Sequence, residues 1–106
     1  MKYCLFIDPH SCKSSAVQHA QDLTIALLAQ KQQVKLFFYG YAVETAFNKD
    51  NSWKKLANKG ILLHVCSTIA ENHLKRGQQV NTYFSLAGLG IWMDTVLESD
   101  IYLEIR

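Results

Sequence analysis

The sequence has 106 residues, with one proline and three cysteines, and no two cysteines form a C-x-x-C pair. An odd number of cysteines without such a pair argues against a disulfide scaffold and favours free thiols in a reducing compartment. The apolar start of the chain turns polar at Asp8, too early for a secretory signal or a membrane span. We therefore expect a cytoplasmic protein that does not contact a membrane.

The sequence also has no large excess of charge of either sign. Its net charge is +2, and the basic and acidic residues are interspersed. Without a basic face or stripe, no direct contact with nucleic acid is expected. The sequence contains neither a G-x-G-x-x-G after its first apolar segment nor a Walker A motif, so dinucleotide and triphosphate binding lack their phosphate cradle. A phosphatase-type loop needs an arginine six residues after its cysteine. That position holds Gln18 after Cys12 and Asn72 after Cys66, so such a loop is excluded.

Five short apolar segments alternate with stretches of helical periodicity. The predicted strands are Lys2–Ile7, Val34–Tyr39, Ile61–Val65, Tyr83–Ala87 and Ile101–Ile105. The predicted helices are Ala16–Lys31, a turn at Val43–Phe47, Trp53–Asn58, Thr68–Arg76 and a last helix lined by Ile91, Val96 and Leu97. A loop is expected at Asn48–Ser52.

Strands that alternate with helices predict a parallel sheet covered on both faces, with right-handed crossovers. Hydrophobic residues make up 49% of the chain, enough for one core, and no linker, repeat or low-complexity tract divides it. We predict one domain over residues 1–106, a flavodoxin-like three-layer α/β domain with a mostly parallel five-stranded sheet. The large apolar side chains beyond the needs of this core are candidate interface residues, namely Trp53, Tyr83, Ile91 and Trp92.

Cys66 comes at the end of the third predicted strand, where a helix is expected to follow. Thr68 and Glu71 form a capping-box signature that marks the start of this helix. Sites in parallel sheets form at this end of the strands, and unpaired helix amides there would stabilise a thiolate. The charge of Glu71 opposes a thiolate, and so does apolar burial. Position alone therefore favours an inert strand-end cysteine over a nucleophile.

The other thiols and histidines allow simpler interpretations. Cys4 lies in mid-strand and is expected to be core filler. If the loops after the first and third strands are neighbours, Cys12 could resolve an oxidised or persulfidated Cys66. The favoured interpretation is that Cys12 is an ordinary exposed loop thiol without this role. His64 shares a strand face with Cys66 and either supports a thiolate as a cation or packs in the interior. His10 and His64 each precede a cysteine by two residues, but further ligands are lacking, so no metal is expected.

Several landmarks match a known family when they are taken in order. They are Phe37-Phe38-Tyr39 at the end of the second strand, Val65-Cys66 at the end of the third, Lys75-Arg76-Gly77 one helix later, the segment from Phe84 to Gly90 (F-S-L-A-G-L-G), and Ser99-Asp100 before the last strand. With these landmarks the chain resembles the DsrE/TusD group of sulfur-relay proteins over most of its length. Three segments depart from the family pattern, one of them the loop after Tyr39, which is shorter than in the family. The segment from Cys66 to Gly77 is longer than in the family, and the segment from Gly77 to Phe84 is shorter.

The resemblance implies a flavodoxin-like fold and a sulfurtransferase role without a cofactor. Cys66 stands at the family's cysteine position, so it would accept sulfane sulfur as a persulfide and pass it to a thiol of a partner protein. Independently of the family, the positions of the tight turn Gly88-Leu89-Gly90 and of His64 suggest that they line the site. The resemblance further implies homo- or hetero-oligomers with DsrE-like paralogues, and a pathway of either tRNA 2-thiouridine synthesis or sulfur oxidation.

Two hypotheses follow from the sequence. In the first, the chain is a sulfur-carrier subunit with the persulfide on Cys66. In the second, it is a non-catalytic structural or small-ligand-binding subunit of a DsrE-like hetero-oligomer, and Cys66 is inert. The reactivity of this one thiol separates the two.

Overall fold

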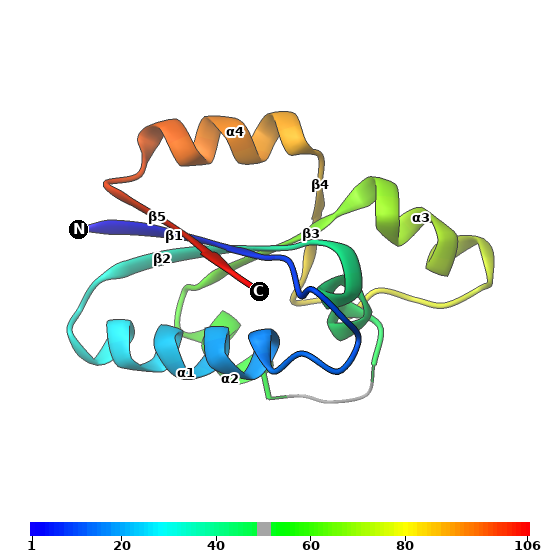
Figure 1. The fold of residues 1–106 in the computed structure, drawn as a ribbon, viewed down its shortest axis with the longest axis horizontal. Coiled ribbons are helices and arrows are strands. Elements are labelled where there is room, and N and C mark those ends of the chain that lie inside the picture. Colours follow the sequence, from blue (N-terminus) through cyan, green and yellow to red (C-terminus); the bar gives the residue numbers. More distant parts are fainter. Residues whose placement is uncertain (49–51) are drawn as a thin grey trace.

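A five-stranded parallel sheet forms the centre of the protein, with strand order β4-β3-β2-β1-β5. The computed structural model describes residues 1–48 and 52–106. Its strands are β1 (Lys2–Ile7), β2 (Gln33–Phe38), β3 (Leu62–Cys66), β4 (Ser85–Ala87) and β5 (Ile101–Ile105), and all four described pairings are parallel (Figure 1). The predicted flavodoxin-like α/β class is confirmed.

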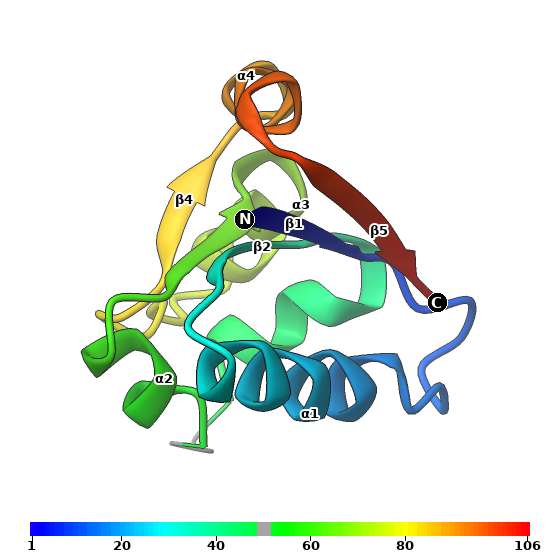
Figure 2. The same cartoon turned by 90° about the vertical axis from the view of Figure 1, so that its left-hand side faces the viewer.

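Helices cover both faces of this sheet. Helices α1 (Ala16–Ala29) and α2 (Lys54–Asn58) lie on one face, and α4 (Leu89–Glu98) lies on the other (Figure 2). The strand order explains this, because the chain moves in one direction from β1 to β4 and then returns across the sheet to β5. Right-handed crossovers in opposite directions place their helices on opposite faces. No helix in the described part of the chain is both long and apolar enough to cross a membrane.

Two further helices lie at the carboxyl edge of the sheet. The 3-10 helix η1 (Gly40–Ala46) follows β2, and α3 (Ser67–Lys75) follows β3 without an intervening loop. Helix α3 ends as the sequence predicts, because Gly77 adopts φ +81° directly after the last turn, a conformation that favours glycine.

Adjacent phenylalanines of β2 anchor the two outer layers. The ring of Phe38 packs edge-on against Trp53, which precedes α2, with 5.1 Å between ring centroids. The ring of Phe37 points to the opposite face and stacks on Trp92 of α4, with 5.2 Å between centroids. This division follows from the strand geometry, in which successive side chains alternate between faces. Each tryptophan therefore attaches one helical layer to the sheet.

The burial of the two tryptophans corrects one expectation. Trp53 and Trp92 are each only 2% exposed, so the prediction that they form interface surface is wrong. The face of α4 also differs from the predicted one: Val96 packs toward the core, but Ile91 is exposed and Leu97 is 80% exposed. The large indole of Trp92 takes the inner face of α4, and this rotation turns the neighbouring apolar residues outward.

Element boundaries differ from the prediction by small amounts. Strand β4 is shorter than predicted and begins at Ser85 rather than Tyr83, and α1 ends before Lys31, which adopts φ +62°. The predicted loop at positions 48–52 falls mainly on positions 49–51, which lie outside the described residues.

Candidate functional site

Cys66 is both the last residue of β3 and the residue that caps the N-terminus of α3. Its backbone angles are φ −59° and ψ 115°, and the helix begins at the next residue, Ser67. The predicted capping box is wrong, since no side chain caps α3. Glu71 instead pairs with Lys75 at 3.4 Å on the exposed side of the helix. The Glu71 carboxylate, which was expected to oppose a thiolate at Cys66, is therefore paired with a cation one turn further along α3.

The neighbouring strand brings a second helix N-terminus to the same place. Cys66 pairs with Ala87 of β4, and Gly88 directly after it caps α4. The first-turn amides of α3 and α4 thus start from adjacent strands at the same edge of the sheet. Such amides, together with the positive ends of the helix dipoles, stabilise anions. A Cβ atom built on Gly88 or Gly90 would meet nothing within 4 Å, so this turn leaves open space.

Burial is the main constraint on the thiol of Cys66. The residue is 3% exposed and belongs to the same core cluster as Ala87 and Phe84. Cys4 is fully buried in mid-strand, which confirms that it is core filler. Cys66 differs from Cys4 in its place at a strand end and helix start. Any reaction of Cys66 with another protein requires this edge to open.

His64 packs on the same face of β3, in register with Phe37 and Ser85. Its Nδ1 atom is buried and has no hydrogen-bond partner among the described residues. Burial lowers the pKa of His64 below its usual 6.5, and the positive charge of Lys35 lowers it further. The neutral imidazole is therefore favoured near neutral pH. Of the two interpretations of His64, interior packing agrees with this environment and a supporting cation does not.

Cys12 lies exposed in the turn after β1. A resolving role for Cys12 depends on the loops after β1 and β3 being neighbours. They are not neighbours, because β2 lies between β1 and β3. The chain after β2 fills the intervening position. Gly40 has φ +57° there, and a Cβ atom on it would lie 2.9 Å from Oδ1 of Asp8. Adjacent strands therefore do not bring Cys12 to Cys66.

One cluster near the edge was not foreseen from the sequence. The ring of His73 in α3 stacks on Phe47 with 4.6 Å between centroids, and its Nδ1 lies 2.6 Å from Oε1 of Gln78. These side chains border a hollow of about 290 Å³ at the C-terminal end of α3. No sequence motif marks these residues, because they come from separate elements. Within residues 1–48 and 52–106, no three histidine, cysteine or acidic side chains converge to hold a metal ion.

Comparison with known proteins identifies relatives by fold only. Neither a protein-family model nor a curated protein sequence matches the chain. Among solved structures, the YchN protein of E. coli superposes with a TM-score of 0.83 at 16% identity, over 98% of this chain and 99% of that one. MTH1491 of Methanobacterium thermoautotrophicum, described as a protein of unknown function, gives 0.78 at 15% identity, over 97% of each chain. The shared feature is the fold. It is consistent with the DsrE-like fold that the sequence landmarks imply, and at these identities it carries no statement about activity.

Proposed function

We propose that the protein is a sulfur-carrier subunit that holds sulfane sulfur as a persulfide on Cys66 and passes it to a thiol of a partner protein. The observation that supports this most is the position of Cys66 between two helix N-termini, those of α3 and α4. The family landmarks of the sequence add the chemistry, since they match Cys66 to the persulfide position of the DsrE/TusD group.

The reaction is two successive thiol exchanges and needs no oxidant. The Cys66 thiolate attacks the outer sulfur of a donor persulfide, the donor S–S bond breaks, and the donor leaves as a thiolate. The acceptor thiolate then attacks the outer sulfur on Cys66, which is released as a thiolate again. The first-turn amides of α3 and α4 stabilise the anionic forms of Cys66 before and after each transfer.

The burial of Cys66 sets the condition for transfer. Because Cys66 is only 3% exposed, docking of a donor or acceptor has to uncover its thiol. The same burial favours a second candidate function, in which Cys66 only packs. The protein would then be a non-catalytic structural or small-ligand-binding subunit of a DsrE-like hetero-oligomer.

Partners and pathway rest on the resemblance alone. The donor and acceptor are proteins, in a relay that serves either tRNA 2-thiouridine synthesis or sulfur oxidation, and the carrier itself makes no contact with RNA. The relay operates in the cytoplasm, where thiols remain reduced. Assembly with identical or paralogous subunits is part of the proposal.

The test is persulfide loading from a cysteine desulfurase and cysteine, followed by alkylation and intact mass measurement. The wild-type chain gains one sulfur. Cys66→Ser loses this gain completely, while Cys12→Ser, at the exposed thiol, and Cys4→Ala, in the core, retain it. A wild-type chain that gains no sulfur, alone and with its DsrE-like partners present, would establish the non-catalytic candidate instead.

A further inference from the structure

The outer edge of β5 differs from most natural sheet edges. Edge strands are usually shortened, interrupted by proline or charged with lysine, which prevents pairing with other chains. Strand β5 is five residues long, reads Ile-Tyr-Leu-Glu-Ile and contains neither proline nor lysine. Its middle is open to solvent, with Tyr102 42% and Leu103 36% exposed. This edge therefore offers an uninterrupted template for another strand.

The backbone of β5 shows which groups face outward. The carbonyl of Ile105 accepts a hydrogen bond from the amide of Asp8 at 2.9 Å, at the end of β1. Because backbone polar groups alternate in direction along a strand, Leu103 also points its amide and carbonyl toward β1. Tyr102 and Glu104 then direct theirs away from the sheet. Two outward residues, separated by one inward residue, are the arrangement that antiparallel pairing requires.

We propose that β5 pairs with β5 of a second copy of this chain, antiparallel and centred on Leu103, to form a continuous ten-stranded sheet. In this register Tyr102 lies opposite Glu104 of the second copy. Asp100, just before the strand, takes no part in the pairing, because its carboxylate accepts a hydrogen bond from the amide of Lys2 in β1 at 2.8 Å. The carboxylate of Glu104, the one charged side chain within β5, then faces a hydrogen-bond donor across the interface, which stabilises a cross-strand pair. A shift by two residues in one direction would place the two Glu104 carboxylates against each other. A shift by two residues in the other direction would place Tyr102 opposite Tyr102 and leave Glu104 without this donor.

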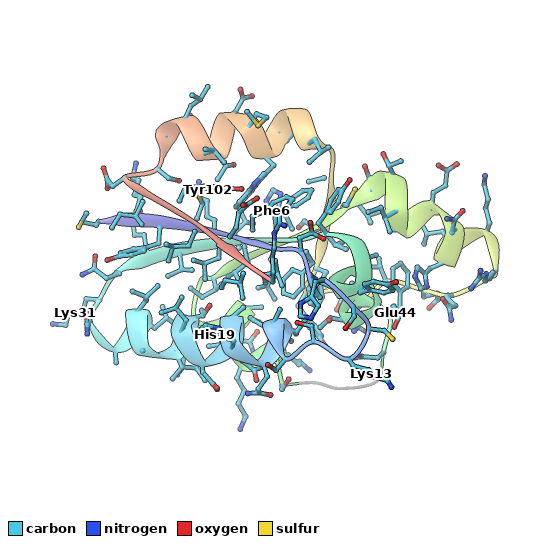
Figure 3. The ribbon with its side chains drawn as sticks, in the orientation of Figure 1. Phe6, Lys13, His19, Lys31, Glu44 and Tyr102 are labelled. Carbon is cyan, nitrogen blue, oxygen red and sulfur yellow. The ribbon has the colours of Figure 1, made fainter. Side chains whose placement is uncertain are left out.

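Helix α4 adds apolar surface to the same interface. Leu89, Met93 and Leu97 recur every four residues and form one stripe, and all three are exposed. Leu89 and Met93 line a hollow of 330 Å³ together with Tyr102, so the stripe faces the β5 side of the molecule. Figure 3 shows Tyr102 and Phe6 on the α4 side of the sheet.

The symmetry of the pairing brings the two stripes together. Two strands that pair antiparallel in one continuous sheet are related by a two-fold axis perpendicular to that sheet. Both copies of α4 then lie on the same face, beside the axis, and their apolar stripes face each other. The pairing rests on the sheet edge and not on sulfur chemistry, so Cys66→Ser forms the same dimer as the wild-type chain.

The test is the oligomeric state measured by sedimentation equilibrium on the full chain. The wild-type chain should be a dimer at about 100 µM and dissociate on dilution. Leu103→Lys and Leu103→Glu each place like charges across the two-fold axis and should weaken the dimer at least about tenfold. An equimolar mixture of the two variants should restore it, which also shows that both fold. The matched control is Leu86→Lys, at the exposed leucine of the opposite edge strand β4, and it should leave the dimer unchanged.

Amide hydrogen exchange tests the register independently. The amides of Tyr102 and Glu104 should be protected at the concentration where the dimer forms and should exchange at least about tenfold faster after dilution. A wild-type chain that stays monomeric at about 100 µM, or a mixture of the two charge variants that stays monomeric, overturns the proposal. A dimer in which these two amides exchange freely overturns it as well, because the contact must then lie elsewhere.

Discussion

The two edges of the sheet are built in opposite ways. Strand β4 has three residues, is followed by a glycine that caps α4, and lies beside Cys66. Strand β5 has five residues and lies beside β1, which carries no candidate reactive group other than the buried Cys4. A short edge strand limits pairing with other chains, whereas a longer one without proline or lysine permits it. The β4 side therefore suits transient access to a thiol, and the β5 side suits stable association.

The comparison separates two requirements of a carrier protein. A persulfide site has to open for donor and acceptor, so it benefits from a short strand and a glycine turn with free space around it. A subunit contact has to persist, so it benefits from regular backbone pairing. The two proposals place them on opposite edges, where one side could open without breaking the other. The following predictions test whether the two edges are as different as this comparison requires.

The largest expected effect concerns the anchoring of β4. Phe84 directly precedes this strand, is nearly buried and packs edge-on against Phe38 with 5.1 Å between ring centroids. Phe84→Ala should lower the free energy of unfolding by about 3–5 kcal/mol, because it leaves a cavity in the core. Leu103→Ala on β5 should cost only about 1 kcal/mol, since that side chain is already partly in water. Urea unfolding of both variants, at a concentration where the chain is monomeric, measures the difference.

Equal costs for the two variants would contradict the comparison. They would mean that Leu103 of β5 contributes to the core of the single subunit as strongly as Phe84 beside β4. The side chain of Leu103 would then not be available for contact with a second copy.

The sequence predicts the parts of this molecule that depend on local patterns. The alternation of apolar segments and amphipathic helices predicts the strands, the layers and the mid-strand burial of Cys4. The order of strands is not local, because it depends on which crossover passes over which face. For this reason the expected proximity of the loops that carry Cys12 and Cys66 was wrong. The same limit applies to the pairing of Cys66 with Ala87, which brings the two helix N-termini together.

Helix faces show a second limit. The periodicity of α4 is visible in the sequence, but its apolar residues surround the helix, so the pattern does not select a face. The buried side is decided by Trp92, whose ring fits against Phe37. The capping box at Thr68 failed for a similar reason: β3 runs directly into α3, and Cys66 takes the capping position first.

The next effect is a pH dependence on the β4 side, reported by His64. Its pKa is lowered in the folded protein by burial and by Lys35, so the unfolded chain binds the proton more readily. Stability is therefore fully present above pH 6.5 and decreases as the pH falls from 6.5 through the folded-state pKa. His64→Gln should flatten this decrease between about pH 7 and about pH 5 in chemical unfolding curves. The matched control His19→Gln, at an exposed helix position, should leave the slope as in the wild-type chain. An unchanged slope in His64→Gln would show that the imidazole is already solvated.

The smallest effect is spectroscopic and lies on the β5 side. Burial raises the pKa of Tyr102 to about 12, and the charge and hydrogen bond of Glu104 contribute to the rise. The folded state thus favours the neutral phenol, and this contribution to stability is lost as the pH rises above the usual value of 10. An absorbance titration at the phenolate band should show a late step that disappears in Tyr102→Phe and remains in Tyr41→Phe, a substitution at another exposed tyrosine. Glu104→Gln should move the step to lower pH. If the step does not move, the charge of Glu104 does not act on Tyr102 within one subunit. An attraction between the same two side chains across the proposed dimer would then not be expected.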